Sequence, residues 1–235
     1  MSARTRQAVG YSLGLISVVL LIAGNEVGKI GGGSPPLHAS PAVYLDAVAS
    51  SGAALIGGFL VIVAWLAFAG FFAVAVGSME RAGQVEVSGR LILGGAVLTA
   101  AIGIAGAPPL AAAGVLAADG DLSPQIAKAL VLLNAVTFVL TWLTAAVPMG
   151  LSAARLGRVR MLPRVLSWSG LVLAPMLAAG SLAVWRYEAA FLAWMLTMIW
   201  IAAASITLTW RATRGHTSPV ARDRTAAKTA VHATS

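Results

Sequence analysis

The stretch GAALIGGFLVIVAWLAFAGFFAVAVG, residues 52–77, contains no charged side chain. A helix needs about 20 apolar residues to cross the roughly 30 Å hydrocarbon core of a bilayer, so this stretch is long enough to span a membrane. The whole chain has the same character, because 59% of its 235 residues are hydrophobic and only 10% are charged. Soluble domains carry about 25% charged residues. The sequence therefore predicts a protein embedded in lipid.

Five further apolar stretches have a similar length, and none of the six holds Asp, Glu, Lys, Arg or His in its interior. We predict an all-α, polytopic bundle of six transmembrane helices. The predicted spans are residues 8–24, 52–77, 91–107, 129–151, 165–184 and 189–210. They make residues 1–212 a transmembrane domain. Residues 213–235 are rich in Thr, Ala and Arg, and we expect them to form a disordered, basic cytoplasmic tail.

The first span follows Arg4 and Arg6, as the apolar part of a secretory signal would. Cleavage after Ala23 would place Leu21 at the −3 position, where a small residue is needed. We therefore expect an uncleaved signal anchor at this end of the chain.

Lysine and arginine are distributed unevenly between the connections. With the N-terminus in the cytoplasm, 13 of the 16 basic residues fall on inner segments, and only Lys29, Lys128 and Arg186 fall on outer ones. Such an excess of Lys and Arg marks the cytoplasmic side. An even number of spans returns the C-terminus to the same side. Abundant Ala and an excess of Arg over Lys are typical of high-GC bacterial genomes, so we expect a multi-pass protein of the bacterial plasma membrane.

The stretch RLGRVRMLPRVLSWSG, residues 155–170, carries four arginines beside an apolar run. It could be a nucleic-acid patch, a lipid-binding handle or a topological anchor. Its basic residues are Arg155, Arg158, Arg160 and Arg164. Beside nine other inner charges, they are best explained as an orientation signal with a second role in contacting anionic lipid headgroups. The basic tail has no aromatic residue to stack on bases, so we expect no nucleic-acid partner.

Polar side chains line one face of the fourth span, in NAVTFVLTWLTAAVP, residues 134–148. Asn134, Thr137, Thr141 and Thr144 fall within about 80° of arc on an α-helix, and Pro148 continues the same face. Such a stripe either lines a polar cavity or substrate path, or forms hydrogen bonds to neighbouring helices. The second role is common in membrane bundles.

Pro108 and Pro109 follow the predicted third span, and the sequence leaves open whether they break its helix. A break would either end the helix near the membrane surface or leave residues 110–118 as a re-entrant or interfacial half-helix. In the outer loop, AVYLDAV, residues 42–48, is expected to form a short interfacial helix. We expect Asp121 or Ser123 to cap the fourth helix, with Pro124 in its first turn.

The sequence lacks the residues that several kinds of catalytic and binding site require. The chain has no cysteine, which excludes disulfides, thiolate metal sites and cysteine nucleophiles. Intramembrane acids or histidines, which proton-coupled carriers usually need, are missing from the spans. Glu26, His38 and Asp46 share the first outer loop but are too few and too scattered to predict a metal site. No phosphate-binding loop or catalytic triad is present. We predict no catalytic residue, no metal and no cofactor.

The segment MLPRVLSWSGLVLAP, residues 161–175, resembles a broad bacterial family of multi-span integral membrane proteins of unknown function. The matching residues are Leu162, Pro163, Arg164, Trp168 and Gly170. The family often has Trp and Gly where Val165 and Ser167 stand here. Residues 40–65 also look like the family's first outer loop and second span. The resemblance implies a membrane fold over residues 8–210 and implies no activity.

These observations favour a non-enzymatic accessory or assembly component of the membrane. Its expected partners are the bilayer with its anionic headgroups and a second membrane protein or a further copy of the chain. The alternative is a small-solute permease or facilitator that uses the stripe on the fourth span. An intramembrane enzyme is a third and weaker alternative.

Overall fold

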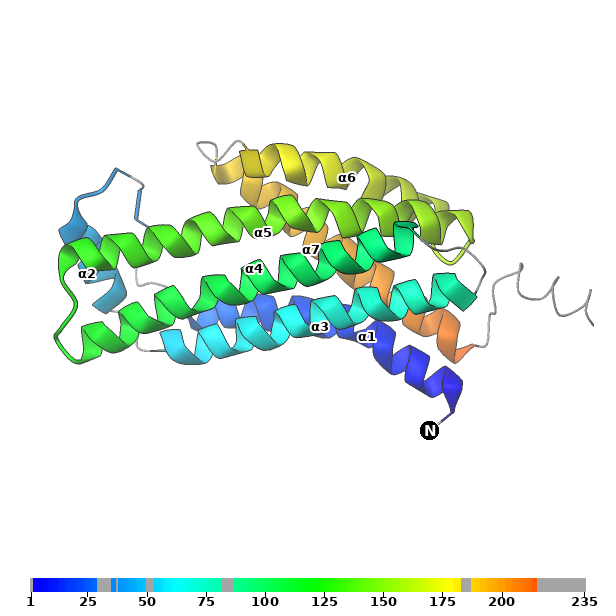
Figure 1. Ribbon diagram of the computed structural model, residues 1–235, viewed down its shortest axis with the longest axis horizontal. Coiled ribbons are helices and arrows are strands. Elements are labelled where there is room, and N and C mark those ends of the chain that lie inside the picture. The colour runs from blue at the N-terminus through cyan, green and yellow to red at the C-terminus, as the bar shows by residue number, and fades with distance from the viewer. Residues whose placement is uncertain are drawn as a thin grey trace, which may run out of the picture.

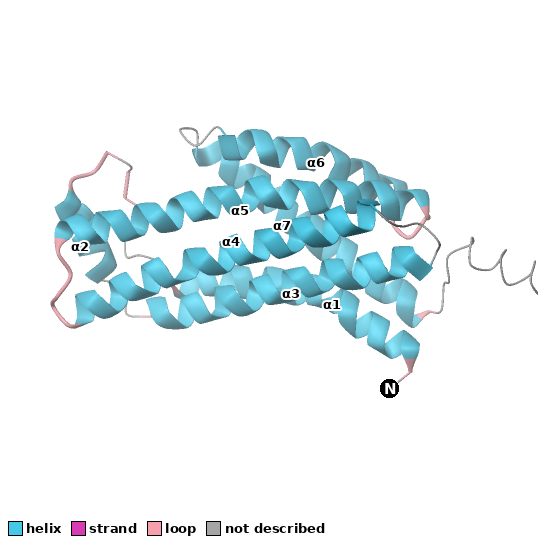
Figure 2. Ribbon diagram, in the orientation of Figure 1, coloured by secondary structure: helices cyan, strands magenta, loops and turns pink. Residues whose placement is uncertain are grey.

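The computed structural model describes residues 2–28, 35–36, 38–49, 53–81, 87–182 and 187–214. Within these ranges all regular secondary structure is helical (Figure 2). The helices are α1 (Ala3–Val27), α2 (Pro41–Ala49), α3 (Ala54–Arg81), α4 (Val87–Ala118), α5 (Pro124–Arg158), α6 (Arg164–Leu182) and α7 (Tyr187–Thr213). Most of the predicted tail, residues 215–235, lies outside the described residues.

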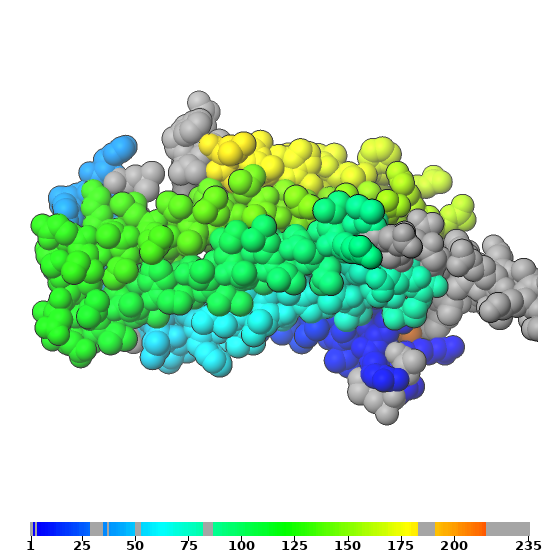
Figure 3. Space-filling view, in the orientation of Figure 1, coloured from blue at the N-terminus to red at the C-terminus, as the bar shows by residue number. Residues whose placement is uncertain are grey.

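Six of these helices, all except α2, are long and apolar enough to cross a membrane. The predicted all-α, polytopic bundle is therefore confirmed. Each long helix runs antiparallel to the next and packs against it, and α7 returns to pack against α1 (Figure 1). The six helices thus form a closed ring in the order α1, α3, α4, α5, α6, α7. Figure 3 shows α3, α4 and α5 side by side over one face of the bundle.

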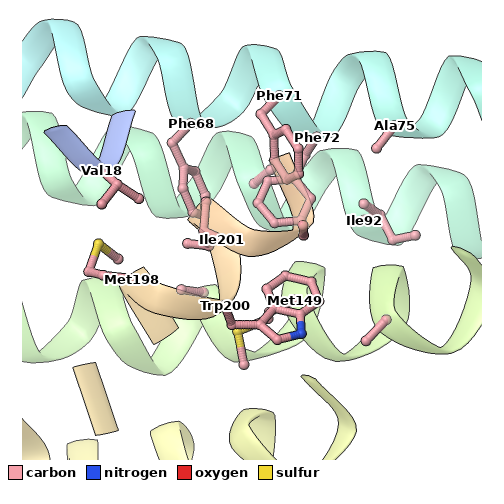
Figure 4. Close-up of a cluster of buried hydrophobic side chains, with 14 of the residues drawn as sticks. Val18, Phe68, Phe71, Phe72, Ala75, Ile92, Met149, Met198, Trp200 and Ile201 are labelled. Carbon is pink, nitrogen blue, oxygen red and sulfur yellow. The ribbon is translucent and has the colours of Figure 1, made fainter. Parts of the chain in front are cut away.

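The interior of the ring is filled by large side chains. Phe68, Phe71 and Phe72 of α3 are almost fully buried and point toward Met149 of α5 and Ile201 of α7 (Figure 4). Apolar association does not drive helices together in lipid, so close contact and dispersion must do so. Such contact needs small residues where backbones meet. A Cβ on Gly57 of α3, for example, would lie 2.5 Å from the backbone of Gly28, just after α1.

The helix does not break at Pro108 and Pro109, because α4 continues through both prolines to Ala118, beyond the predicted end of the third span at residue 107. Packing explains the difference. Beyond the prolines, Leu110 and Ala113 pack in a second apolar cluster with α2 and the first turns of α5. The segment is also rich in alanine, the best helix former. Tertiary contacts and local propensity together outweigh the two hydrogen bonds that proline cannot donate.

The second cluster forms a lobe at one end of the bundle. Tyr44 and Val48 of α2 pack there against Leu122 and Val131. The helix expected at residues 42–48 is α2, and Ser123 is the residue that caps α5, accepting a hydrogen bond from the Ile126 amide at 3.4 Å. At 1.5 Å per residue, α4 and α5 are about 48 and 52 Å long, well beyond the roughly 30 Å bilayer core. The lobe is built on the end of α4 and the start of α5.

Candidate functional site

The polar stripe lies on one face of α5, as its spacing predicts. Thr137, Thr141 and Thr144 each donate a hydrogen bond to a carbonyl three or four residues earlier in α5, at 2.7 to 3.1 Å. Asn134 instead bonds across helices, because its Nδ2 donates to the carbonyl of Gly106 in α4 at 2.7 Å. Each hydroxyl and the amide nitrogen therefore already has an acceptor within the protein.

The same face packs closely against α4. A Cβ on Gly106 would lie 2.6 Å from Oγ1 of Thr137, and a Cβ on Gly95 would lie 2.9 Å from Cδ of Pro148. Thr141 is almost fully buried, at 1% exposure. These contacts place Asn134, Thr137 and Pro148 in the α4–α5 interface, whereas Thr144 is half-buried and its hydroxyl bonds only within α5.

A cluster of aromatic rings occupies the interior, and sequence reasoning missed it. Trp142 of α5 lies 5.6 Å from Trp65 of α3 and 5.8 Å from Trp194 of α7, measured between ring centroids. Phe138 lies 5.6 Å from Trp142 and 6.0 Å from Trp194. The available signal was the position of these tryptophans, which stand inside the predicted spans and not at their ends, where interfacial rings gather.

Two groups in this cluster are unusual for a membrane interior. The indole Nε1 atoms of Trp142 and Trp194 are buried and have no hydrogen-bond partner among the described residues. Both rings meet neighbouring rings in edge-to-face geometry, which directs ring edges toward aromatic faces. The cluster therefore fills the centre of the ring with aromatic rings, which carry two unpaired N–H donors and no charged or acid–base group.

Among the charged side chains that the structure describes, those at the two ends of the bundle have opposite net charge. We call the end where α1, α4 and α6 begin the basic end (Figure 1). Its described charged residues are Arg4, Arg6, Glu80, Arg81, Arg90, Arg155, Arg158, Arg160, Arg164, Arg211 and Arg214. The opposite end carries Glu26, Asp46, Asp119, Asp121 and Lys128. This separation of charge along the helix axes is the pattern expected of a protein oriented across a bilayer.

The predicted orientation residues lie at the turn between α5 and α6. Arg155 is half-buried, whereas Arg158, Arg160 and Arg164 are exposed. The turn closes α5 as a Schellman motif, in which the Met161 amide donates to the Leu156 carbonyl at 2.8 Å and the Arg160 amide to the Gly157 carbonyl at 3.0 Å. The motif needs a left-handed residue, and Arg160 fills that place with φ of 56°.

Arginine is a costly choice at this position. Glycine is usual there, because a side chain in the left-handed region costs roughly 1–2 kcal/mol. The end of α7 supports the strained turn, since the guanidinium of Arg211 donates to the carbonyl of Arg160. Beside it, the guanidinium of Arg214 lies 4.2 Å from the ring centroid of Trp210. Three segments of the chain therefore meet at this corner of the basic end.

The opposite end holds the short helix α2 in place through Lys128. Its Nζ donates to the Ala39 carbonyl at 2.9 Å and lies 5.5 Å from the ring centroid of Tyr44. The Tyr44 hydroxyl donates in turn to the Pro36 carbonyl at 3.0 Å. Across the described ranges, no group of three or more His, Asp or Glu side chains is placed to hold a metal ion.

The fold and these surfaces define a multi-pass helical membrane protein. Comparison of the chain with protein-family models, with curated proteins and with solved structures gave no match. The similarity of residues 161–175 to a bacterial membrane family therefore stays a prediction.

Proposed function

We propose that the protein is a non-enzymatic accessory or assembly component of a bacterial plasma membrane, with its basic end and both termini in the cytoplasm. It acts by holding a fixed helical surface in the membrane for a partner protein or a further copy of itself. The observation that supports this proposal is the aromatic packing of the interior, which we infer to be closed. Aromatic rings from α3, α5 and α7 meet at its centre.

The packing of the stripe supports this role over that of a small-solute permease. A permease needs polar groups that are free to exchange hydrogen bonds with a passing solute. The stripe hydroxyls are bonded to their own helix, and Asn134 is bonded to α4. Opening a path along this face would require α4 and α5 to separate where Gly106 meets Thr137.

Cysteine labelling tests the closed interior directly, because the natural chain has no cysteine to remove. Thr141→Cys is nearly isosteric, and its thiol would replace a hydroxyl at a buried position. We expect a membrane-impermeant thiol reagent to leave Thr141→Cys unmodified in proteoliposomes while it modifies the exposed control Ser40→Cys. Rapid modification of Thr141→Cys would favour the permease and contradict the closed interior.

The same cysteine-free background allows a test of the orientation in the membrane. On intact cells, an impermeant maleimide should label Ser40→Cys, whereas Arg160→Cys should react only after permeabilisation. Labelling of both from outside would refute the proposed topology.

Cross-linking tests the accessory role. Purification after cross-linking in native membranes should yield one stoichiometric partner or a defined oligomer. Recovery of an uncross-linked monomer alone would contradict it.

A further inference from the structure

We propose that the turn between α5 and α6 is a binding site for the headgroup of an anionic phospholipid. The site consists of Arg158, Arg160, Arg164, Val165 and Trp168, which we call the turn patch. This inference deepens the proposed function, because it names a lipid partner for the basic end of the same membrane protein.

The first observation is a group of exposed positive charges. Arg158, Arg160 and Arg164 are exposed, and among the described residues no carboxylate lies within ion-pair distance of them. The only described acid at this end of the bundle is Glu80, near the end of α3. Guanidinium groups bind phosphate oxygens through paired N–H donors, so the turn patch has the chemistry of a phosphate receptor.

The second observation is the backbone of Arg160. Its left-handed conformation is one that glycine adopts without strain, and glycine would complete the Schellman motif equally well. The turn is nevertheless built with arginine and is supported from α7 by Arg211. The exposed Arg160 side chain adds no packing to the fold that would offset the backbone strain. It is explained if that side chain binds something outside the protein.

The third observation is the apolar surface beside the arginines, which suits the acyl part of a lipid. Val165 is 79% exposed and Trp168 is 68% exposed, on the first turns of α6 beside the arginines. Trp168 lies four residues after Arg164 and therefore on the same face of the helix. A phospholipid supplies a phosphate for the arginines and acyl carbons for Val165 and the indole of Trp168.

The test counts lipids that stay bound to the purified full-length protein in neutral detergent, measured by native mass spectrometry during titration. We expect phosphatidylglycerol to be retained and phosphatidylcholine to be lost. Arg160→Gly should weaken phosphatidylglycerol binding by at least about fivefold, because it removes one cationic contact near the headgroup. Since glycine suits the turn, this variant should fold normally and melt at the same temperature or higher without lipid.

Arg4→Gln is the matched control, because it removes one exposed positive charge from the same end of the bundle. Figure 1 places the start of α1 at the opposite edge of the bundle from the α5–α6 turn. Phosphatidylglycerol binding by Arg4→Gln should stay within about twofold of binding by the unmodified protein, because salt in the solution screens charges beyond about 10 Å. If Arg4→Gln and Arg160→Gly lost phosphatidylglycerol binding equally, the binding would reflect a general attraction between charged surfaces. That result would overturn the proposal.

Two further arms identify the ligand. Brominated phosphatidylglycerol should quench the tryptophan fluorescence of the protein more than brominated phosphatidylcholine, and Trp168→Phe should abolish the difference. Glycerol phosphate, a soluble anion, should not displace the lipid. Equal quenching by both lipids, or displacement by glycerol phosphate, would overturn the proposal. The topology and cross-linking results stand independently of all these outcomes, so failure of the lipid site is distinguishable from failure of the proposed function.

Discussion

Ser205 of α7 bridges two backbone groups of α1. Its hydroxyl donates to the Tyr11 carbonyl at 2.6 Å and accepts from the Leu15 amide at 3.0 Å. These two groups are four residues apart and pair with each other in a regular α-helix. The hydroxyl of α7 therefore takes part in the hydrogen-bond ladder of α1. Such a link closes the helix ring between its first and last members.

Close approach at this point depends on Gly14. A Cβ there would lie 2.9 Å from Cδ2 of Phe71 and 3.0 Å from Cβ of Ser205. We expect Gly14→Ala to lower the free energy of unfolding by about 1–3 kcal/mol, because α1 must move away from both α3 and α7. Ser205→Ala should cost only about 0.6 kcal/mol, since Tyr11 and Leu15 can then pair directly. Thermal unfolding in detergent measures both, and a larger loss in Ser205→Ala would refute this order.

A second pair of glycines offers a sharper comparison. A Cβ on Gly57 would lie 2.5 Å from backbone atoms of Gly28, whereas a Cβ on Gly94 would meet nothing within 4 Å. Backbone cannot rotate away as a side chain can, so Gly57→Ala should destabilise the α1–α3 contact by about 1–3 kcal/mol. Gly94→Ala should be neutral or stabilising by up to about 1 kcal/mol through helix propensity. Similar melting temperatures for the two variants would contradict the close α1–α3 packing.

Sequence patterns predicted the features that depend on neighbouring residues along the chain. Uncharged runs located the long helices, and the three- and four-residue spacing placed the stripe on one face of α5. The two cap candidates Asp121 and Ser123, with Pro124, located the start of α5, and the structure identifies Ser123 as the cap. The contact from Ser205 to Tyr11 joins residues 194 positions apart and has no local signature. Helices that are apolar on all sides also give no sign of which face is buried. The aromatic centre and the continuation of α4 past Pro108 therefore required the structure.

The stripe on α5 should show a graded response to substitution. Asn134 bonds to another helix, whereas Thr144 bonds only to its own. We expect Asn134→Ala to cost about 0.6 to 1.7 kcal/mol, between the average and the largest values measured for interhelical hydrogen bonds in membranes. Thr144→Val keeps the side-chain volume and removes only a hydroxyl bonded to carbonyls that are already paired within α5. It should therefore cost less than Asn134→Ala. Thermal unfolding of the two variants checks the order, and an equal or larger loss in Thr144→Val would contradict an interhelical role for Asn134.

The lobe around α2 should behave as a unit separate from the transmembrane core. Tyr44 is 1% exposed and belongs to the second apolar cluster, which shares no residue with the main one. Tyr44→Ala should cost about 3–5 kcal/mol in local packing and release α2, because a large buried ring is lost. We expect faster proteolysis within residues 38–49 and an almost unchanged melting temperature for the bundle. Tyr44→Phe is the control, because it loses only the hydrogen bond to Pro36 and should leave α2 protected. A large fall in the melting temperature of Tyr44→Ala would mean that the lobe and the bundle unfold together.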